Sequence, residues 1–373
     1  MKPRPGTRSL ALIPGGLVLL LSLPLLGALV AGLDVSQYFH FPPQAHTDHS
    51  GFSWPVFLGL AVVLGLVLLP FFVRGLTYFL SGKAGRSKPE RPFPWWGWAG
   101  VMFTLAVWFL AWTRLEWFEP WQRLTYTPLW LGYILILNGL TYRRSGSCML
   151  LHRPVYFLLL FPASSLFWWF FEYLNRFVYN WHYIEVQHFS SLEYAAFATM
   201  AFATVLPAVL GTRDFLLTFS WWKRAYGNFL RLRAPRPKLL AAGVLLLSAA
   251  GLFWLGLYPD YLFPLLWVSP LLIILSLLAL RGEPHILSPI KQGDWSHMLA
   301  ATAAALICGF FWEMWNFYSL AKWKYSLPFV HGFPVFEMPL LGYAGYLPFG
   351  LECAVIGDLL ARILTNQPSR RLG

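Results

Sequence analysis

The feature that most constrains this chain is a series of long apolar stretches separated by short polar loops. A helix rises about 1.5 Å per residue, so about 20 apolar residues span the roughly 30 Å hydrocarbon core of a bilayer. Stretches of this kind lie at 10–33, 54–80, 95–113, 128–142, 154–174, 192–211, 238–257, 263–281, 295–318 and 339–365. We therefore expect an all-α fold, a polytopic transmembrane bundle of about ten helices.

Composition agrees with a membrane location, because 57% of the residues are hydrophobic and only 12% are charged, against roughly 25% charged in soluble domains. The formal net charge of +12 resides in short loops, so we expect no nucleic-acid partner. Cys148, Cys308 and Cys353 form no CxxC pair, and no disulfide or redox role is expected. The chain lacks Walker, GxSxG, HExxH and Rossmann glycine motifs, so no cofactor is predicted.

The basic residues follow the positive-inside rule. They fall in alternate loops, at 81–94, 143–153, 212–238 and 282–294, and in the C-terminal tail. We expect these loops and both termini to be cytoplasmic, in a membrane of the bacterial inner-membrane type. The first stretch is longer than the core of a signal peptide and is interpreted as a retained helix, with a cleaved signal as the alternative.

An internal repeat links the two halves of the chain. Glu313 lies 141 residues after Glu172, and each glutamate opens an E-x-x-N string that is followed by a W-x-Y segment. Each copy holds an even number of crossings, so the copies should be parallel and related about the membrane normal. The predicted parts are two N-terminal helices (1–94), a first four-helix repeat (95–237) and a second repeat with a basic tail (238–373). Chance similarity of aromatic-rich helices is the alternative.

Glu172 and Glu313 are the first candidate acids, at the outer boundary of the hydrocarbon. Asn175 and Asn316 follow them at i+3, on the same helix face, where an amide can hydrogen-bond the carboxyl. We expect these asparagines to orient the glutamates. The alternative for Glu172 is an ion pair with Arg176 at i+4.

Three further acids complete the candidate set. Glu193 and Glu337 precede returning helices at the same level, so four carboxyl groups are expected to converge in one aromatic-walled pocket and to donate protons there. Stabilisation of helix N-termini is the alternative role for these two. Glu352 lies near the middle of the last stretch, where a carboxyl is costly and is interpreted as functional, with a buried hydrogen bond as the alternative.

Aromatic residues gather at the same outer level. The candidate ligand-binding residues are the two asparagines together with Trp312, Trp315, Trp323 and Tyr325. Such rings bind flat apolar molecules or stabilise cations, although an interfacial aromatic belt explains them equally. His40, His46, Asp48 and His49 are metal-donor types, but their spacing fixes no common face, so no metal site is predicted.

The segment around 313–340 resembles the membrane-embedded lycopene cyclase and carotenoid hydratase group, and 172–193 resembles it more weakly. The resemblance lies in Glu313, the Trp323 to Tyr325 segment and the PVFE run that ends at Glu337. Met338 stands where that group has a second glutamate. The resemblance implies that Glu313 and Glu337 are the acids that protonate a carotenoid double bond.

These observations predict an integral membrane protein that acts on an isoprenoid or another lipid by carboxyl general-acid chemistry. The expected partners are membrane lipids and an apolar isoprenoid-like ligand, and the sequence leaves protein partners open. A proton-coupled or small-solute transporter is the first alternative, with its site between the halves near mid-membrane. A non-catalytic subunit of a membrane complex is the second.

Overall fold

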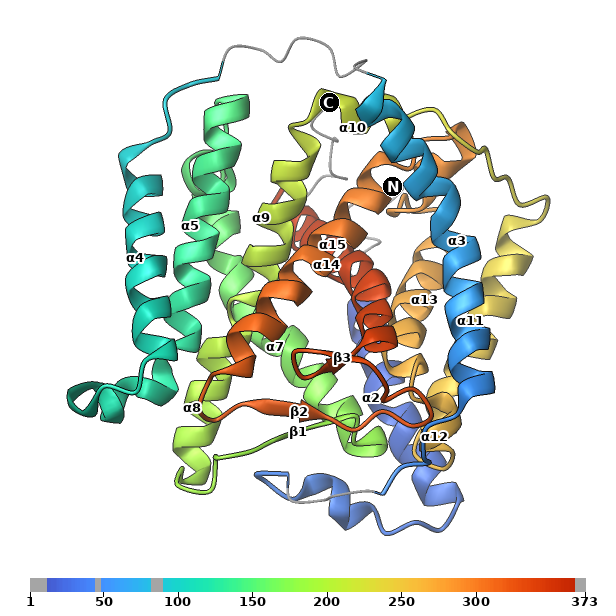
Figure 1. Cartoon of the computed structure of the whole chain (residues 1–373). Coiled ribbons are helices and arrows are strands. Elements are labelled where there is room, and N and C mark those ends of the chain that lie inside the picture. The colour runs from blue at the N-terminus through green and yellow to red at the C-terminus, as the bar shows by residue number, and fades with distance from the viewer. Residues whose placement is uncertain (1–11, 44–47, 82–89, 366–373) are drawn as a thin grey trace.

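The chain folds into a bundle of helices with short β-ribbons at one end (Figure 1). This computed structural model describes residues 12–43, 48–81 and 90–365. The α-helices of these residues are α2 (Leu12–Val30), α3 (Trp54–Leu80), α4 (Trp95–Trp112), α5 (Tyr126–Ser145), α6 (Met149–His152), α7 (Pro154–Val178), α8 (Ser191–Phe202), α9 (Val205–Leu217), α10 (Ser220–Tyr226), α11 (Pro237–Phe253), α12 (Pro259–Leu262), α13 (Leu265–Leu280), α14 (Ser296–Phe317) and α15 (Tyr346–Thr365). The shorter elements are the 3-10 helices η1 (Val35–Phe39), η2 (Glu116–Leu124), η3 (Ser288–Gln292) and η4 (Leu340–Gly345) and the strands β1 (Trp181–Tyr183), β2 (Trp323–Tyr325), β3 (Pro334–Val335) and β4 (Met338–Pro339).

The all-α class is confirmed, and several helices are compatible with a membrane protein. Five helical segments of the described residues are long and apolar enough to cross a bilayer, namely Trp54–Leu80, Trp95–Trp112, Pro154–Val178, Ser191–Leu217 and Ser296–Phe317. Apolar helices of shorter length are found at Pro14–Val30, Pro237–Phe253 and Leu265–Leu280.

Two of the predicted stretches are not single regular helices. The stretch 192–211 is divided between α8 and α9 at residues 203–204. Ser164 of α7 occupies the break, where its hydroxyl donates to the Phe202 carbonyl (2.5 Å) and accepts from the Leu206 N–H (3.0 Å). A neighbouring helix thus satisfies the backbone groups that the break releases, as membrane interiors require. The last stretch begins with η4 and becomes α-helical only at Tyr346.

Small residues set the closest helix contacts. A Cβ added to Gly100 of α4 would lie 2.9 Å from the Cβ of Leu135 on α5, and one added to Gly350 of α15 would lie 2.3 Å from the Ala301 carbonyl oxygen of α14. Backbones that approach so closely gain van der Waals contact, which drives helix association where lipid removes the hydrophobic driving force.

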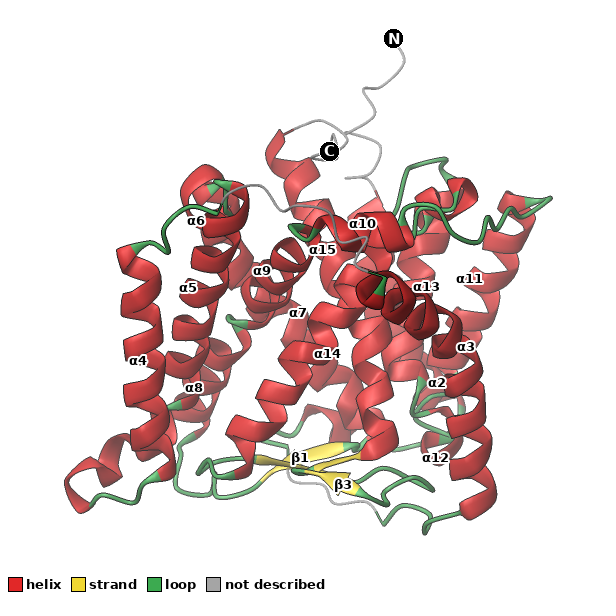
Figure 2. Cartoon of the chain, turned by 45° about the horizontal axis from the view of Figure 1, so that its top comes forward, coloured by secondary structure: helices red, strands yellow, loops and turns green. Residues whose placement is uncertain are grey.

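The described parts of the basic loops, at 90–94, 143–153, 212–238 and 282–294, lie together at the end of the bundle opposite β1 and β2, where Figure 2 shows α6 and α10. The Arg91 N–H donates to the Arg143 carbonyl there (2.9 Å). Arg362, in the last turn of α15, donates to the Pro284 carbonyl (2.5 Å) and so joins that helix to the loop before η3. Loops that are distant in sequence therefore form one cation-rich end.

Candidate functional site

The two W-x-Y segments pair with each other in one antiparallel ribbon, which crosses the end of the bundle opposite the basic loops (Figure 1). Trp181 stands opposite Tyr325, and Tyr183 stands opposite Trp323. Each tryptophan therefore faces the tyrosine of the other segment, and the pairing has local two-fold symmetry. The sequence match between the two segments is thus also a spatial contact.

The two asparagines fix this ribbon to the helices that precede it. Asn175 donates through Nδ2 to the Trp181 carbonyl (2.8 Å), and Asn316 donates in the same way to the Trp323 carbonyl (2.8 Å). Each Oδ1 accepts from the backbone, from Asn180 N–H at 2.8 Å and from Trp323 N–H at 3.0 Å. The expectation that these amides orient the glutamates is wrong, because both amides bond backbone groups instead. Each helix ends just after its asparagine, and the backbone groups that follow have no partner within the helix and need one from a side chain.

Glu172 is held by three donors that converge on one oxygen. Its Oε1 accepts from Trp168 Nε1 (3.0 Å), Trp181 Nε1 (3.0 Å) and the Tyr183 hydroxyl (2.7 Å). Arg176 instead donates to backbone carbonyls of the segment between α2 and α3, including that of Tyr38 at 2.6 Å. The carboxyl therefore anchors the first W-x-Y segment to α7.

Glu313 is fully buried, and like Glu172 it accepts hydrogen bonds from aromatic side chains, but from a different set of them. Its Oε1 accepts from the hydroxyls of Tyr325 and Tyr346, both at 2.7 Å, and Trp323 Nε1 donates to the Tyr325 hydroxyl (2.9 Å). Burial, together with the nearby carboxyl of Glu313, raises the pKa of Tyr325 well above its ordinary value of 10.0, so the hydroxyl stays protonated and donates. Glu313 Oε2 has no hydrogen-bond partner within residues 12–43, 48–81 and 90–365.

Tyr346 takes the place that a side chain of α14 would otherwise fill. The position that matches Trp168 at the offset of 141 is Gly309, where an added Cβ would lie 2.4 Å from ring carbons of Tyr346. The absent side chain at Gly309 thus admits a hydroxyl donor from α15 to Glu313. No spacing in the sequence indicated Tyr346.

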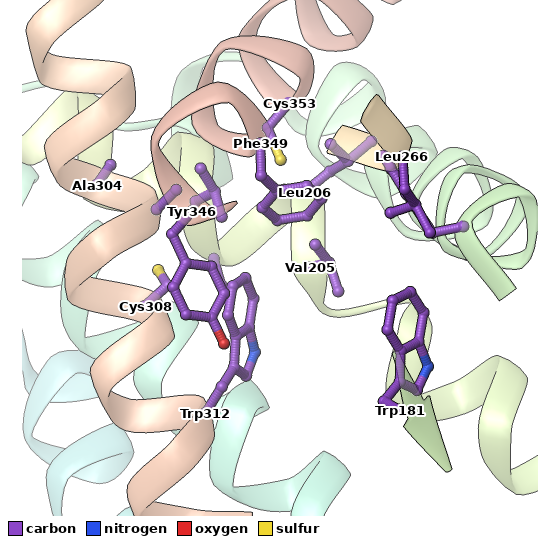
Figure 3. Packing of buried hydrophobic residues seen from close by; sticks show 14 of the residues in the cluster. Trp181, Val205, Leu206, Leu266, Ala304, Cys308, Trp312, Tyr346, Phe349 and Cys353 are labelled. Carbon is purple, nitrogen blue, oxygen red and sulfur yellow. The ribbon is translucent and has the colours of Figure 1, made fainter. Parts of the chain in front are cut away.

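Beside these carboxyl groups lies a cavity of about 720 Å³, within the roughly 300–1,000 Å³ of small-molecule sites. Its walls come from α3, α8, α13, α14, η4 and the β1–β2 ribbon and are mostly apolar and aromatic. Trp181 stacks on Trp267 with ring centroids 5.6 Å apart, and Trp312 lies beside Tyr346 at 5.7 Å. Figure 3 shows Trp181 facing Trp312 and Tyr346.

The cavity opens sideways through the apolar surface of the bundle. Leu60, Val63 and Val67 of α3 and Met200 of α8 line it and are also exposed on the outside of the molecule. Helix α3 is bonded to the rest of the bundle near its ends, through the Ser53 N–H to Phe329 carbonyl bond (2.9 Å) at one end and Arg74 at the other. The middle of α3 therefore forms the rim of a lateral opening.

None of the five predicted acids lines this cavity. Glu172 and Glu313 are bonded to hydroxyl and indole groups of residues that line the cavity, Tyr183 and Trp181 for Glu172 and Tyr346 for Glu313. Glu193 is exposed and makes a capping box with Ser190 at the start of α8. The expectation that four carboxyl groups converge in the pocket is wrong, because a charged carboxyl against an apolar wall is costly and each finds polar partners elsewhere.

The remaining two acids differ sharply in their surroundings. Glu337 lies in the turn between β3 and β4 and forms an ion pair with Lys322. Glu352 is buried in α15, and neither of its oxygens makes a hydrogen bond of normal geometry within the described part of the chain. The backbone N–H of Leu271, on α13, is the polar group close to it. Glu352 is therefore a buried carboxyl without a hydrogen bond of normal geometry among the residues that the structure describes.

The predicted ligand-binding residues divide into two groups. Asn316, Trp312, Trp323 and Tyr325 line the cavity, whereas Asn175 does not. Trp315 also lies outside the cavity lining and packs against Trp130 at 5.0 Å. Trp267 and Tyr183 also line the cavity but were not among the predicted site residues. The match of Tyr183 to Tyr325 in the two W-x-Y segments is the signal that indicates Tyr183.

A metal centre is not evident in the part of the chain that the structure describes, where no three His, Cys, Asp or Glu side chains are grouped to hold an ion. His46 lies outside the described residues. His49 instead bonds Asp260 at 2.6 Å, which fixes the segment before α3 to α12.

The chain matches no protein-family model, and neither a curated protein nor a solved structure matches it.

Proposed function

We propose that this chain is an integral membrane protein that binds an isoprenoid-like or other apolar lipid in the aromatic cavity and acts on it by proton donation. The observation that carries the proposal is the lateral cavity whose wall includes two tyrosines, Tyr325 and Tyr346, whose hydroxyls both donate to the buried carboxyl of Glu313. Aromatic walls bind flat apolar molecules and stabilise the cation that forms when a double bond is protonated.

The proton would reach the ligand through a tyrosine. Both hydroxyls donate to Glu313, so delivery to the cavity requires one hydroxyl to turn toward the ligand. The π electrons of a ligand double bond then form the new C–H bond with that proton, the tyrosine O–H bond breaks, and protonated Glu313 returns a proton to the tyrosine oxygen. The carbocation that remains loses a proton from an adjacent carbon, which forms a shifted double bond, and that proton returns through a tyrosine to the Glu313 carboxylate. Glu313 is thus proposed as the acid, and Tyr346 or Tyr325 as the group that touches the substrate.

We further propose that about ten helical spans cross a membrane of the bacterial inner-membrane type, with the basic end and both termini in the cytoplasm. The gathering of the basic loops at one end supports this orientation. The symmetric pairing of the two W-x-Y segments supports a relation between 95–237 and 238–373 about the membrane normal.

Extraction of bound lipids from the purified protein, followed by mass spectrometry, tests the binding proposal. We expect an apolar lipid in stoichiometric amount from the wild type and its loss from Val268→Trp, which adds a large ring at a residue that lines the cavity. The matched control is Val62→Trp, at an exposed position of α3 that does not line it. Equal lipid content in all three proteins would exclude the cavity as the binding site.

A proton-coupled transporter is the second candidate, favoured by the unpaired carboxyl of Glu352 in the bundle interior. It predicts that a pH gradient drives solute uptake into proteoliposomes and that Glu352→Gln stops this uptake. Lipid bound at the cavity without any pH-driven uptake would favour the first proposal.

A further inference from the structure

Asn180 occupies a fixed position at the cavity wall, in the turn between α7 and β1. Its N–H donates to Asn175 Oδ1 (2.8 Å), and its carbonyl accepts from the Ser326 N–H (2.8 Å). These two bonds come from both halves of the chain and hold the backbone rigidly. Asn180 lines the cavity and is 1% exposed.

The side-chain amide of Asn180 is not satisfied by the protein. Neither its Oδ1 nor its Nδ2 has a hydrogen-bond partner in the described ranges 12–43, 48–81 and 90–365. Buried polar groups without a partner are unfavourable and uncommon, so an amide of this kind beside a cavity can take a polar partner from a bound ligand once the side chain turns toward it.

The equivalent position in the other half has a protein partner. Lys322 precedes the second W-x-Y segment as Asn180 precedes the first, and it donates to Glu337 and to the Phe317 carbonyl (3.0 Å). Glu193, the counterpart of Glu337, instead caps α8 through Ser190. The first half therefore provides no carboxyl for Asn180.

We infer that Asn180 recognises a neutral oxygen-bearing head group, a hydroxyl or a carbonyl, on the apolar ligand of the cavity. This inference rests on the proposed function and specifies its ligand class. An amide both donates and accepts, which suits a hydroxyl. Arg123 is the single charged side chain among the described residues that line the cavity, and it is exposed. A phosphate bound at Asn180 would therefore be buried without a balancing charge in the wall.

Binding of three related polyenes to the full-length protein in lipid nanodiscs tests the inference. The probes are all-trans-retinol, its hydrocarbon analogue axerophtene and retinyl phosphate, and the readout is saturable energy transfer from the cavity tryptophans. We expect the wild type to bind retinol about tenfold more tightly than axerophtene, as one or two hydrogen bonds would provide. Retinyl phosphate should bind more weakly than retinol.

Asn180→Leu should abolish the preference for retinol and leave axerophtene binding unchanged, with Asn180→Ala as a second variant. Without ligand, the Leu variant should unfold at the same temperature as the wild type or higher, because it removes an unpaired amide. The matched control is Asn138→Leu, since Asn138 is also buried but donates to the Ile134 carbonyl (2.9 Å) and accepts from the Leu150 N–H (3.1 Å). That variant should be less stable and keep the preference.

The outcomes separate this inference from the function on which it rests. If none of the three probes binds saturably, the cavity does not bind such ligands and the proposed function fails. If retinol and axerophtene bind equally to the wild type, or if Asn180→Leu keeps the retinol preference, the role of Asn180 is refuted while binding at the cavity stands. Tighter binding of retinyl phosphate than of retinol would refute the neutral head group.

Discussion

Gly309→Ala tests the contact between α14 and α15 on which the environment of Glu313 depends. The added Cβ would lie 2.4 Å from two ring carbons of Tyr346 and 2.8 Å from a third, in a buried region with no room for them. Overpacking of this kind costs about 1–3 kcal/mol, and loss of the tyrosine bond to the carboxyl costs about 1.5–3 kcal/mol more. The higher helix propensity of alanine relative to glycine offsets about 1 kcal/mol of this loss in the free energy of unfolding.

The free energy of unfolding should therefore fall by about 1.5–5 kcal/mol. Denaturant unfolding in detergent micelles, followed by tryptophan fluorescence, measures this change. The matched control is Gly65→Ala on α3, where nothing lies within 4 Å of the added Cβ and the variant should be as stable as the wild type or slightly more so. If both variants were equally stable, Tyr346 would not be packed on Gly309, and its role as a donor to Glu313 would be wrong.

Three further predictions concern the membrane and the other acids. Glu352→Gln should fold as well as the wild type or better, because it avoids a cost of about 2.5–3.5 kcal/mol for a charge in the bilayer; a thermal midpoint well below that of the wild type would contradict this. Burial raises the pKa of Asp260, but hydrogen bonds from Ser50 and His49 outweigh it and hold this pKa below its ordinary value of 3.8. The ionised Asp260 carboxylate should thus stabilise the folded protein above pH 3.8, and this stabilisation should disappear as the pH falls through the lower pKa of the folded state. In a pH series of unfolding midpoints, the wild type should show this loss and Asp260→Asn should not. Reporter fusions after residues 148 and 225 should be cytoplasmic and a fusion after 260 external, and one reversed reading would exclude the ten-span topology.

The chain's local pattern was sufficient for the class of fold. Helix periodicity and bilayer thickness require long apolar runs, and these runs coincide with helices in the structure because each backbone hydrogen bond within a helix is local. The breaks were not predictable in the same way. The division between α8 and α9 depends on the hydroxyl of Ser164, which lies on another helix.

For the candidate site, the sequence indicated some residues that the structure brings together, but not all of the groups that they touch. The matched spacing of Glu172 and Glu313 before their W-x-Y segments was visible in the chain, and both carboxyl groups do bind tyrosines of those segments. Their asparagines bind backbone instead of carboxyl, since the free groups at a helix end arise only once the chain turns.

Only the tertiary structure decided the rest of the site. It placed Tyr346 against Gly309, directed Glu193 to a helix cap, and left the amide of Asn180 unpaired at a cavity wall. Each of these results depends on side chains from elements that are remote in sequence competing for the same space or the same hydrogen-bonding group. The spacing of residues along one helix shows only which of them share a face of that helix. It does not show which side chain of another helix or loop packs or bonds against that face.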